Sequence, residues 1–477
     1  MQLKAIAVLA LLLMSLSALF YPVAASGPEY RFSYYVMPLF APSQASSGIV
    51  HVGFAYPEGS PPYAPRQIAS YYGFSDLPMY PGLGETIVIV DAFGSPTIYR
   101  DLAVFDSVFQ LPPANLQVIR LPGPSSSTLQ DREGWAVETS LDVEWAHAMA
   151  PYADIVLVEA SSDSVPALYR AVEFAVDMRL GQVISMSWGL PEPYEEQVTG
   201  PGSISSFHQL FEQAISEGIT PVASSGDDGA YNGLAYPNVN YPASDPYVLA
   251  VGGTNLTLSS SQYGTQSLDG AHIASTSEYL WVDSGGGVSS YFEEPSWQSD
   301  AAIEVTTSTG AALPSGRAVP DVSYVAMSPY GPTGWAGLWI YDSTPYVIQE
   351  ESASGQLTTY VLSGWYGVGG TSCGAPQWSA LIADLQSEHA GALGAQALIS
   401  AVAGQMPSAG TVQSSASALP IAAKIYSLSE SYQQYFNVIK PYYALNNNGY
   451  YYYSPGWDAI TGWGSPRATA LLEALGS

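Results

Sequence analysis

Short runs rich in β-branched residues alternate with longer helical patterns through the middle of this chain. The runs cover residues 85–91, 155–159, 183–187, 220–224 and 247–251, and the helical patterns cover 136–149, 164–178 and 205–217. Short apolar runs of this kind are typical of strands buried on both faces, and parallel strands need long, usually helical, connections. The sequence therefore predicts an α/β fold, with a mostly parallel sheet and helices on both faces.

Functional sites in such folds lie at the carboxyl ends of the strands. Three clusters that contain glycine or aspartate follow predicted strands: Asp91-Ala-Phe-Gly94, Ser187-Trp-Gly189 and Ser225-Gly-Asp-Asp-Gly229. Asp91 has two interpretations, as part of a carboxylate relay or as the cap of the following turn, and the turn is slightly favoured.

The N-terminus has the layout of a secretory signal peptide over residues 1–26. Lys4 precedes an apolar run over residues 5–20, and small residues follow before Gly27. A retained membrane anchor is the alternative, but the small residues favour cleavage. We expect residues 27–65 to form an extended N-terminal arm or a short pro-segment, and 66–477 to form one domain with long insertions at about 257–315 and 328–362. No later apolar run reaches the ~20 residues needed to span a bilayer, so no membrane span is expected after removal of the signal.

The charge balance is strongly acidic. Lys and Arg total 12 against 41 Asp and Glu, giving a formal net charge of −29 at pH 7. Such a surface disfavours nucleic acid and anionic membranes as partners, and few basic groups limit self-repulsion when the carboxyls are protonated in acid. The single cysteine excludes an intramolecular disulfide. We expect a secreted monomer that works in an acidic environment, although an acidic surface without this purpose has the same composition.

The segment Gly369-Gly370-Thr371-Ser372 places a serine after a glycine turn and before a predicted helix around Trp378. The N-terminus of a helix favours negative charge near the hydroxyl, which suits a nucleophile. A helix-capping serine explains the same residues equally well. Cys373 is expected to be a small apolar residue, because a thiolate would be scarce in acid.

A nucleophilic serine needs a base, and none of the five histidines lies in a glycine-flanked turn. Glu138 and Asp142 lie four residues apart on a predicted helix and share one face in largely apolar surroundings, so they could form a proton relay. A solvated helix face is the common alternative. Asp227 could donate a hydrogen bond to an oxyanion if it is protonated, with Asp228 as its rival and a turn role open to both.

Eight motifs in order resemble the sedolisin family, the serine-carboxyl peptidases with a subtilisin-like fold, from about residue 66 to the C-terminus. They are Glu138-x-x-x-Asp142 with the segment to Pro151, Ser185-Met-Ser-Trp-Gly189, Ser225-Gly-Asp227, Val251-Gly-Gly-Thr254, Gly285-Gly-Gly-Val-Ser289, Arg317-Ala-Val-Pro-Asp-Val-Ser323, Gly370-Thr-Ser372 and Gly456-Trp-Asp458.

The resemblance implies a secreted, acid-active endopeptidase that hydrolyses proteins or peptides. Ser372 is then the nucleophile, Glu138 its base, Asp142 the residue that orients Glu138, and Asp227 part of the oxyanion hole. Near pH 4 a histidine of ordinary pKa would already be protonated, whereas a glutamate can still accept a proton. Trp188 and Gly189 are expected in the substrate-binding wall, with core packing as the alternative.

The resemblance also implies a Ca²⁺ site near the C-terminus, made from an acidic residue with neighbouring carbonyl groups and from a second acidic residue. Gly456 and Asp458 match the second half, whereas Val438 stands before Ile439 where the first aspartate is expected, unless Asn437 takes its place. Loss of one anionic oxygen predicts weak Ca²⁺ binding.

Two alternatives to the peptidase are an inactive relative that binds peptides or surface polymers, and a structural surface-layer protein. The complete set of four polar site residues argues against the first, and the ordered motifs argue against the second.

Overall fold

The structure, a computed structural model, describes residues 33–34, 37–39, 49–54, 62–77, 80–124, 127–199, 202–264, 274–329, 337–351, 357–387, 419–442 and 445–475. The predicted signal peptide lies outside these residues. Among them, no helix is long and apolar enough to cross a bilayer.

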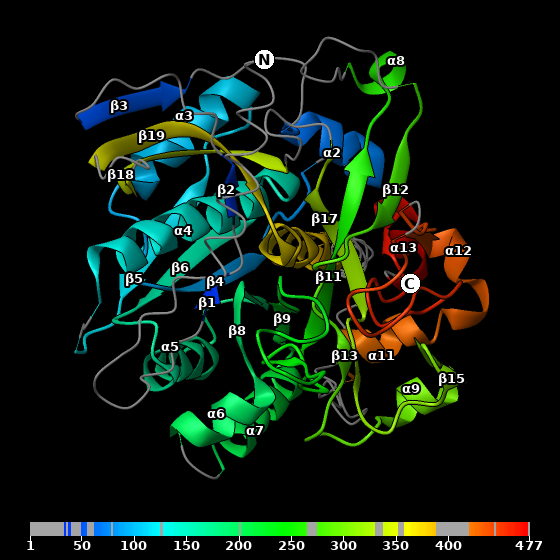
Figure 1. The fold of residues 1–477 in the computed structure, drawn as a ribbon. Helices are drawn as coiled ribbons and strands as arrows, with labels where there is room; N and C mark the ends of the chain where they lie inside the picture. The colour runs from blue at the N-terminus through cyan, green and yellow to red at the C-terminus, as the bar shows by residue number, and fades with distance from the viewer. Residues whose placement is uncertain are drawn as a thin grey trace, which may run out of the picture.

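An eight-stranded sheet forms the centre of the molecule (Figure 1). Its strand order is β12-β11-β9-β7-β4-β6-β5, and β17 also pairs with β11. All pairs are parallel except β11 with β12. The strands are β4 (Thr86–Ala92), β5 (Asn115–Arg120), β6 (Asp154–Ala160), β7 (Val183–Met186), β9 (Thr220–Ser224), β11 (Leu249–Thr257), β12 (Ser277–Leu280) and β17 (Val322–Met327).

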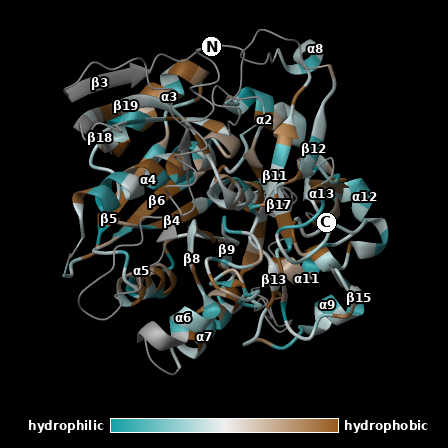
Figure 2. Ribbon diagram, in the orientation of Figure 1, coloured by the Kyte–Doolittle hydropathy of each residue, from teal (hydrophilic) through white to brown (hydrophobic). Residues whose placement is uncertain are grey.

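Alternate residues of the central strands enter two different cores. Ile87 and Ile89 of β4 pack with α2 (Pro65–Tyr72), α3 (Ile98–Phe109) and α4 (Leu129–Met149). Val88 and Val90 pack with α5 (Val165–Asp177) and α7 (Ser203–Ser216). Because side chains alternate across a strand, this pattern requires helices on both faces. Figure 2 shows the hydrophobic residues gathered in these inner strands and helices. The predicted fold class is confirmed.

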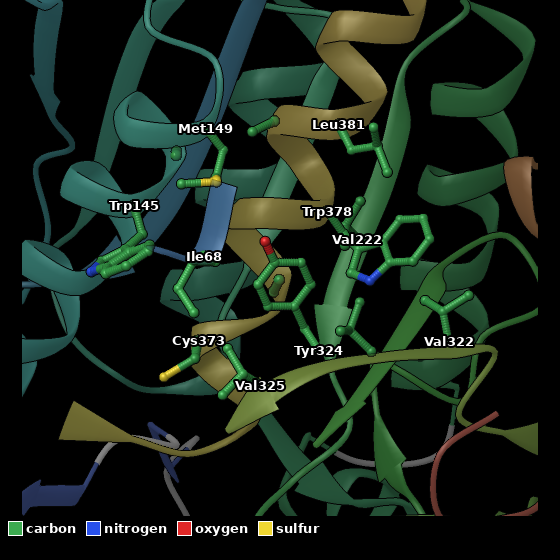
Figure 3. Close-up of a cluster of buried hydrophobic side chains, with 14 of the residues drawn as sticks. Ile68, Trp145, Met149, Val222, Val322, Tyr324, Val325, Cys373, Trp378 and Leu381 are labelled. Atoms are coloured by element: carbon green, nitrogen blue, oxygen red, sulfur yellow. The ribbon is translucent and has the colours of Figure 1, made fainter. Parts of the chain in front are cut away.

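A second sheet packs against α3 and α4 and contains much of the second predicted insertion. Strands β18 (Leu338–Glu351) and β19 (Leu357–Gly369) form a long antiparallel hairpin, and β19 also pairs with β2 (Met37–Leu39) and β3 (Ile49–Phe54). The hairpin leads through Gly370 into the 3₁₀ turn η2 (Thr371–Cys373), and a helix described over 375–387 follows. Figure 3 shows Cys373, Trp378 and Leu381 packed with side chains of β17 and α4.

The remaining elements lie around this frame. They are β1 (Ser33–Tyr34), η1 (Phe74–Asp76), β8 (Trp188–Pro191), α6 (Glu192–Thr199), β10 (Asn240–Tyr241), α8 (Ser260–Tyr263), β13 (Gly287–Val288), α9 (Ser296–Asp300), β14 (Val305–Thr307), β15 (Gly310–Ala312), β16 (Ala318–Val319), α11 (Ile421–Tyr426), η3 (Ser429–Ser431), α12 (Tyr432–Tyr435), β20 (Phe436–Asn437), β21 (Ser465–Pro466) and α13 (Ala468–Leu475).

Candidate active site

Helix α4 carries two of its buried acidic residues, Glu138 and Asp142, at the candidate site. Thr128 begins the helix by accepting a hydrogen bond from the backbone of Asp131 at 3.1 Å. From residue 133 to 149 every residue of α4 is buried, which is expected of a helix that is covered on all sides. Glu138 and Asp142 have no exposed surface, so the alternative of a solvated helix face is excluded.

Ser372 lies on η2, in contact with α4. Gly370 precedes this turn with φ of 124°, a conformation that favours glycine. The Ser372 hydroxyl donates a long hydrogen bond of 3.4 Å to the Ser187 carbonyl. It also lies near enough to Glu138 to favour the ionised form of that carboxyl. The structure therefore brings Ser372 and Glu138 together.

Ser187 joins the nucleophile to the second acid. Its hydroxyl donates to Oδ1 of Asp142 at 2.8 Å, while its carbonyl receives the hydrogen bond from Ser372. Ser187 belongs to a motif that we recognised in the sequence, yet the motif does not reveal this link. Oδ2 of Asp142 and both carboxyl oxygens of Glu138 have no hydrogen-bond partner among the described residues.

Burial dominates the electrostatics of this acid pair. It raises the pKa of Glu138 well above its usual range, and the charge of Asp142 raises it further. Burial, followed by the charge of Asp91, raises the pKa of Asp142 in the same way. Such a pair titrates as one unit and holds at least one proton in acid.

Asp91 is the third buried acid of this group. It lies near the end of β4, has no exposed surface, and its carboxyl oxygens make no hydrogen bond of good geometry with the described residues, although the Thr139 hydroxyl lies near enough to favour the ionised form. Burial raises its pKa to about 7. Because its charge acts on both Glu138 and Asp142, Asp91 belongs to their electrostatic network.

Asp227 approaches from the turn after β9. Its Oδ1 accepts hydrogen bonds from the backbone N–H of Thr371 at 2.8 Å and from the Thr371 hydroxyl at 2.7 Å. Its Oδ2 is buried and has no partner among the described residues. Burial raises the pKa of Asp227 well above its usual range, despite the opposing Thr371 hydrogen bonds. A proton on this carboxyl would therefore sit on Oδ2, while Oδ1 is held by Thr371, the residue before Ser372. Asp228 has an exposed side chain and lacks these contacts.

The Trp188 ring is a core residue. It has no exposed surface, and its Nε1 donates to the Val90 carbonyl at 2.7 Å. Of the two interpretations of this ring, core packing is the one that the structure favours. Contact between this segment and a substrate would therefore come from the backbone of Trp188 and Gly189, where β8 pairs with Tyr34 and Ser33 of β1.

The histidines whose side chains are described have partners of their own. Nε2 of His147 lies 2.8 Å from the Pro112 carbonyl and 3.3 Å from Oδ1 of Asp106. Nδ1 of His208 lies 3.0 Å from Oδ2 of Asp245. Cys373 is a buried free thiol whose pKa is raised by burial, as expected of a packing residue.

The residues predicted to bind calcium line one small cavity. Gly456, Asp458, Val438 and Ile439 all contribute to its wall. Oδ1 of Asp458 already accepts from the backbone of residues 460 and 461 at 2.9 Å each, and Oδ2 accepts from the Thr461 hydroxyl at 3.0 Å. No group of three His, Cys, Asp or Glu side chains suited to a metal occurs in the described part of the chain. Asp458 is the one acidic side chain among these lining residues, so backbone carbonyls and water would have to supply the other oxygens of a Ca²⁺ site.

Comparison with known families identifies the fold. Residues 136–405, more than half of the chain, match the sequence profile of the subtilase family. The chain belongs to the subtilase family. The match begins two residues before Glu138 and includes Asp142, Asp227 and Ser372.

Among subtilases, the sedolisin resemblance predicted from the motifs is confirmed. Kumamolisin from Bacillus sp. (strain MN-32) is 29% identical over 421 residues, covering 87% of this chain and 63% of kumamolisin. Sedolisin from Pseudomonas sp. (strain 101) is 28% identical over 416 residues, covering 84% of this chain and 59% of sedolisin. The chain thus spans about three fifths of the length of these relatives.

A solved structure of Pseudomonas sedolisin, a serine-carboxyl proteinase in complex with two molecules of pseudo-iodotyrostatin, has the same fold. It superposes with a TM-score of 0.60 at 27% sequence identity, covering 86% of this chain and 97% of the sedolisin chain.

Proposed function

We propose that this subtilase is a secreted serine-carboxyl endopeptidase that hydrolyses protein or peptide substrates in acid. The observation that carries the proposal is the meeting of Ser372 with two buried acids of α4 and with Asp227. Ser187 links Ser372 to Asp142, and Thr371 links the turn of Ser372 to Asp227. The chain's relatives sedolisin and kumamolisin support the same class of reaction.

In the proposed reaction, Oγ of Ser372 attacks the carbonyl carbon of a peptide bond and passes its proton to Glu138. The carbonyl oxygen becomes an oxyanion and accepts a hydrogen bond from the protonated Oδ2 of Asp227. Glu138 then returns its proton to the leaving amine as the carbon–nitrogen bond breaks. A water molecule repeats the sequence on the acyl-enzyme and frees Ser372.

Asp142 keeps this transfer reversible. Glu138 can act as a base only when the pair has lost one proton, and the remaining proton is held on the Asp142 side while Glu138 receives the one from Ser372. Burial raises the pKa of both acids, whereas the Ser372 hydroxyl opposes the shift at Glu138 by favouring its ionised form. Activity therefore requires that the Glu138–Asp142 pair has lost one of its two protons and that Asp227 is still protonated.

The test is hydrolysis of a denatured protein at about pH 4 by the purified chain and by Ser372→Ala. Ser379→Ala is the matched control, because Ser379 is a buried serine on the following helix that donates to the Ala375 carbonyl at 2.9 Å. We expect loss of activity only in Ser372→Ala. Retained activity in that variant, or wild-type activity that is highest at pH 7 or above, would rule the mechanism out.

We also propose that a pro-segment lies within residues 27–65, in the part that contains β1 and β2. Tyr34 of β1 pairs with Trp188, directly after Ser187, and Met37 of β2 pairs with Gly369, three residues before Ser372. A peptide strand added to the edge of β8 is a common mode of peptide recognition, so these contacts support a segment that occupies the substrate path. N-terminal sequencing before and after acid treatment tests this idea. An active form that still carries residues 33–39 contradicts it.

We also propose that Ca²⁺ binds only weakly beside Gly456 and Asp458, because Val438 stands where a second carboxylate is expected. Further support is the donor set around Asp458, in which both carboxyl oxygens already accept hydrogen bonds.

A further inference from the structure

Strand β18 has an edge that no other described strand covers. It pairs with β19 on one side, and on the other side Leu338 alone among the described residues forms a bridge, with Tyr63. This edge faces α3 and α4 (Figure 1). Buried backbone N–H groups need acceptors, and here helix carboxyls provide them. Three contacts do so: Tyr341 N to Glu144 Oε2 at 2.9 Å, Ser343 N to Asp101 Oδ2 at 2.9 Å, and Val347 N to Glu133 Oε2 at 3.0 Å.

A fourth carboxyl, Asp342, comes from β18 itself and lies within hydrogen-bonding reach of Asp101. Both oxygens of Asp101 already accept hydrogen bonds, from the Ser343 hydroxyl at 2.6 Å and from the Ser343 N–H and the Thr97 hydroxyl. Oδ1 of Asp342 accepts from Thr344 N at 2.7 Å, whereas its Oδ2 is buried without a described partner. Two carboxyls can share a hydrogen bond only through a proton, and the unpartnered Oδ2 of Asp342 is an oxygen on which that proton can sit.

The surroundings of Asp342 are rich in acids. The largest influences on the pKa values of Asp342 and Glu144 are burial, hydrogen bonds and neighbouring carboxyls. Burial raises the pKa of Asp342 to about 7 and that of Glu144 well above its usual range, and it lowers the pKa of His147. The titratable groups around Asp342 are Asp101 and Asp106 of α3, Glu133, Glu144 and His147 of α4, Tyr346 of β18 and Tyr366 of β19.

We propose that Asp101, Glu133, Glu144 and Asp342 form an acid clasp, which fastens the β18–β19 hairpin to α3 and α4 in acid and releases it as the pH approaches neutrality. The sign follows from linkage. A buried acid with a raised pKa stabilises the docked state fully below its unfolded pKa, and that stabilisation is lost as the pH rises through the folded value, about 7 for Asp342.

The clasp joins the two elements that carry the candidate active site. Strand β19 ends at Gly369 and continues into the turn of Ser372, while α4 carries Glu138 as well as Glu144. Its four carboxyls therefore position β19, which leads to Ser372, relative to α4, which carries Glu138. They do so without contacting a substrate. The clasp itself does not depend on the proposed peptidase reaction, whereas its effect on activity does.

Hydrogen exchange on the full chain tests the clasp without any substrate. Asp342→Asn replaces the proton by an amide N–H, which donates to Asp101 at every pH, and the Asn carbonyl can still accept from Thr344. We compare peptides covering residues 338–351 with peptides covering β4, after correction for intrinsic exchange. In the wild type, the exchange rate of the β18 peptides relative to that of the β4 peptides should rise about tenfold or more between about pH 5 and about pH 7.5. In Asp342→Asn, the same ratio should rise less than about threefold.

Asp300→Asn is the matched control, because it makes the same charge change at an exposed residue of α9 and should behave as wild type. Glu144→Gln is a second variant, which keeps a carbonyl acceptor for Tyr341 N–H and should also flatten the pH dependence. The clasp is refuted if wild-type β18 shows no pH-dependent opening, if Asp342→Asn follows wild type, or if neither variant folds at about pH 4, where the acids they replace are protonated. An inactive chain with the expected exchange pattern would refute only the proposed reaction.

Discussion

Two buried glutamates in this molecule, Glu278 and Glu138, have opposite hydrogen-bonding environments. Glu278 accepts hydrogen bonds from four hydroxyls: Tyr71 at 3.1 Å, Tyr72 at 2.8 Å, Thr254 at 2.6 Å and Ser465 at 2.6 Å. Glu138 is just as buried, yet its carboxyl oxygens have no hydrogen-bond partner within the described residues. Burial raises the pKa of both groups.

This difference indicates that Glu278 has a structural role and Glu138 a role in the proposed reaction. The hydroxyls around Glu278 connect α2, β11 and β21 to β12 and replace the water that the carboxyl lost on folding. Glu138 has the Ser372 hydroxyl and several other acids as neighbours, so the acids repel one another unless they share protons. We therefore expect Glu278 to matter for stability and Glu138 to matter for reaction.

The largest expected effect is in Glu138→Gln. An amide cannot accept the proton of Ser372, so kcat/KM should fall by about 10³-fold or more, while the free energy of unfolding at neutral pH should stay equal or rise. Glu278→Gln is the matched comparison. It should lower the free energy of unfolding by about 1–3 kcal/mol and leave the activity of the folded fraction intact. If Glu138→Gln and Glu278→Gln lost the same free energy of unfolding, the proposed difference between the two glutamates would be wrong.

The ion pair of Arg317 and Asp321 extends the comparison to an acid that is buried beside a cation. Two hydrogen bonds of 2.7 and 2.6 Å join the side chains, and neither is exposed. Arg317→Met should lower the free energy of unfolding by about 3–5 kcal/mol, because it leaves a buried charge unpaired. Chemical unfolding measures this loss, and adding Asp321→Leu should recover much of it. No recovery would show that Arg317 acts through packing alone.

Asp227→Asn sharpens the assignment of the oxyanion donor. An Asn side chain can donate a hydrogen bond at any pH but replaces the neutral acid imperfectly, so activity should fall by about 10²-fold near the optimum. Wild-type activity should decline on the alkaline side as Asp227 ionises, since its raised pKa is what keeps it protonated. A pH profile of kcat/KM should show a weaker alkaline decline in the variant. An unchanged profile would assign that decline to another group.

The smallest effect is expected from calcium removal. Because Asp458 is the single carboxyl among the described residues that line its cavity, excess EGTA should shift the melting temperature by less than about 2 °C. Differential scanning calorimetry with and without added Ca²⁺ measures the shift. A larger stabilisation by Ca²⁺ would show that Asp458 turns away from its N–H donors to bind the ion.

Most of the central fold followed from local patterns. The run at 85–91 became β4, the helical pattern at 136–149 became the main part of α4, and the run at 220–224 became β9. The sequence patterns did not indicate strand β5 or helix α3. The exposed and partly buried residues of β5 do not form the continuous apolar run that marks a buried strand. The β18–β19 hairpin was treated as an insertion, because its role depends on contacts with distant helices.

The sequence by itself determined the fold class, the family resemblance and the identity of the candidate residues Ser372, Glu138, Asp142 and Asp227. These follow from hydrophobic periodicity and from the spacing of a few polar residues, which are local properties of the chain. Only the tertiary structure decided which acids were left without hydrogen-bond partners, that the Trp188 ring belongs to the core, and that Asp342 meets Asp101. Burial and pairing depend on segments up to hundreds of residues apart, and such contacts set the protonation states that no short motif encodes.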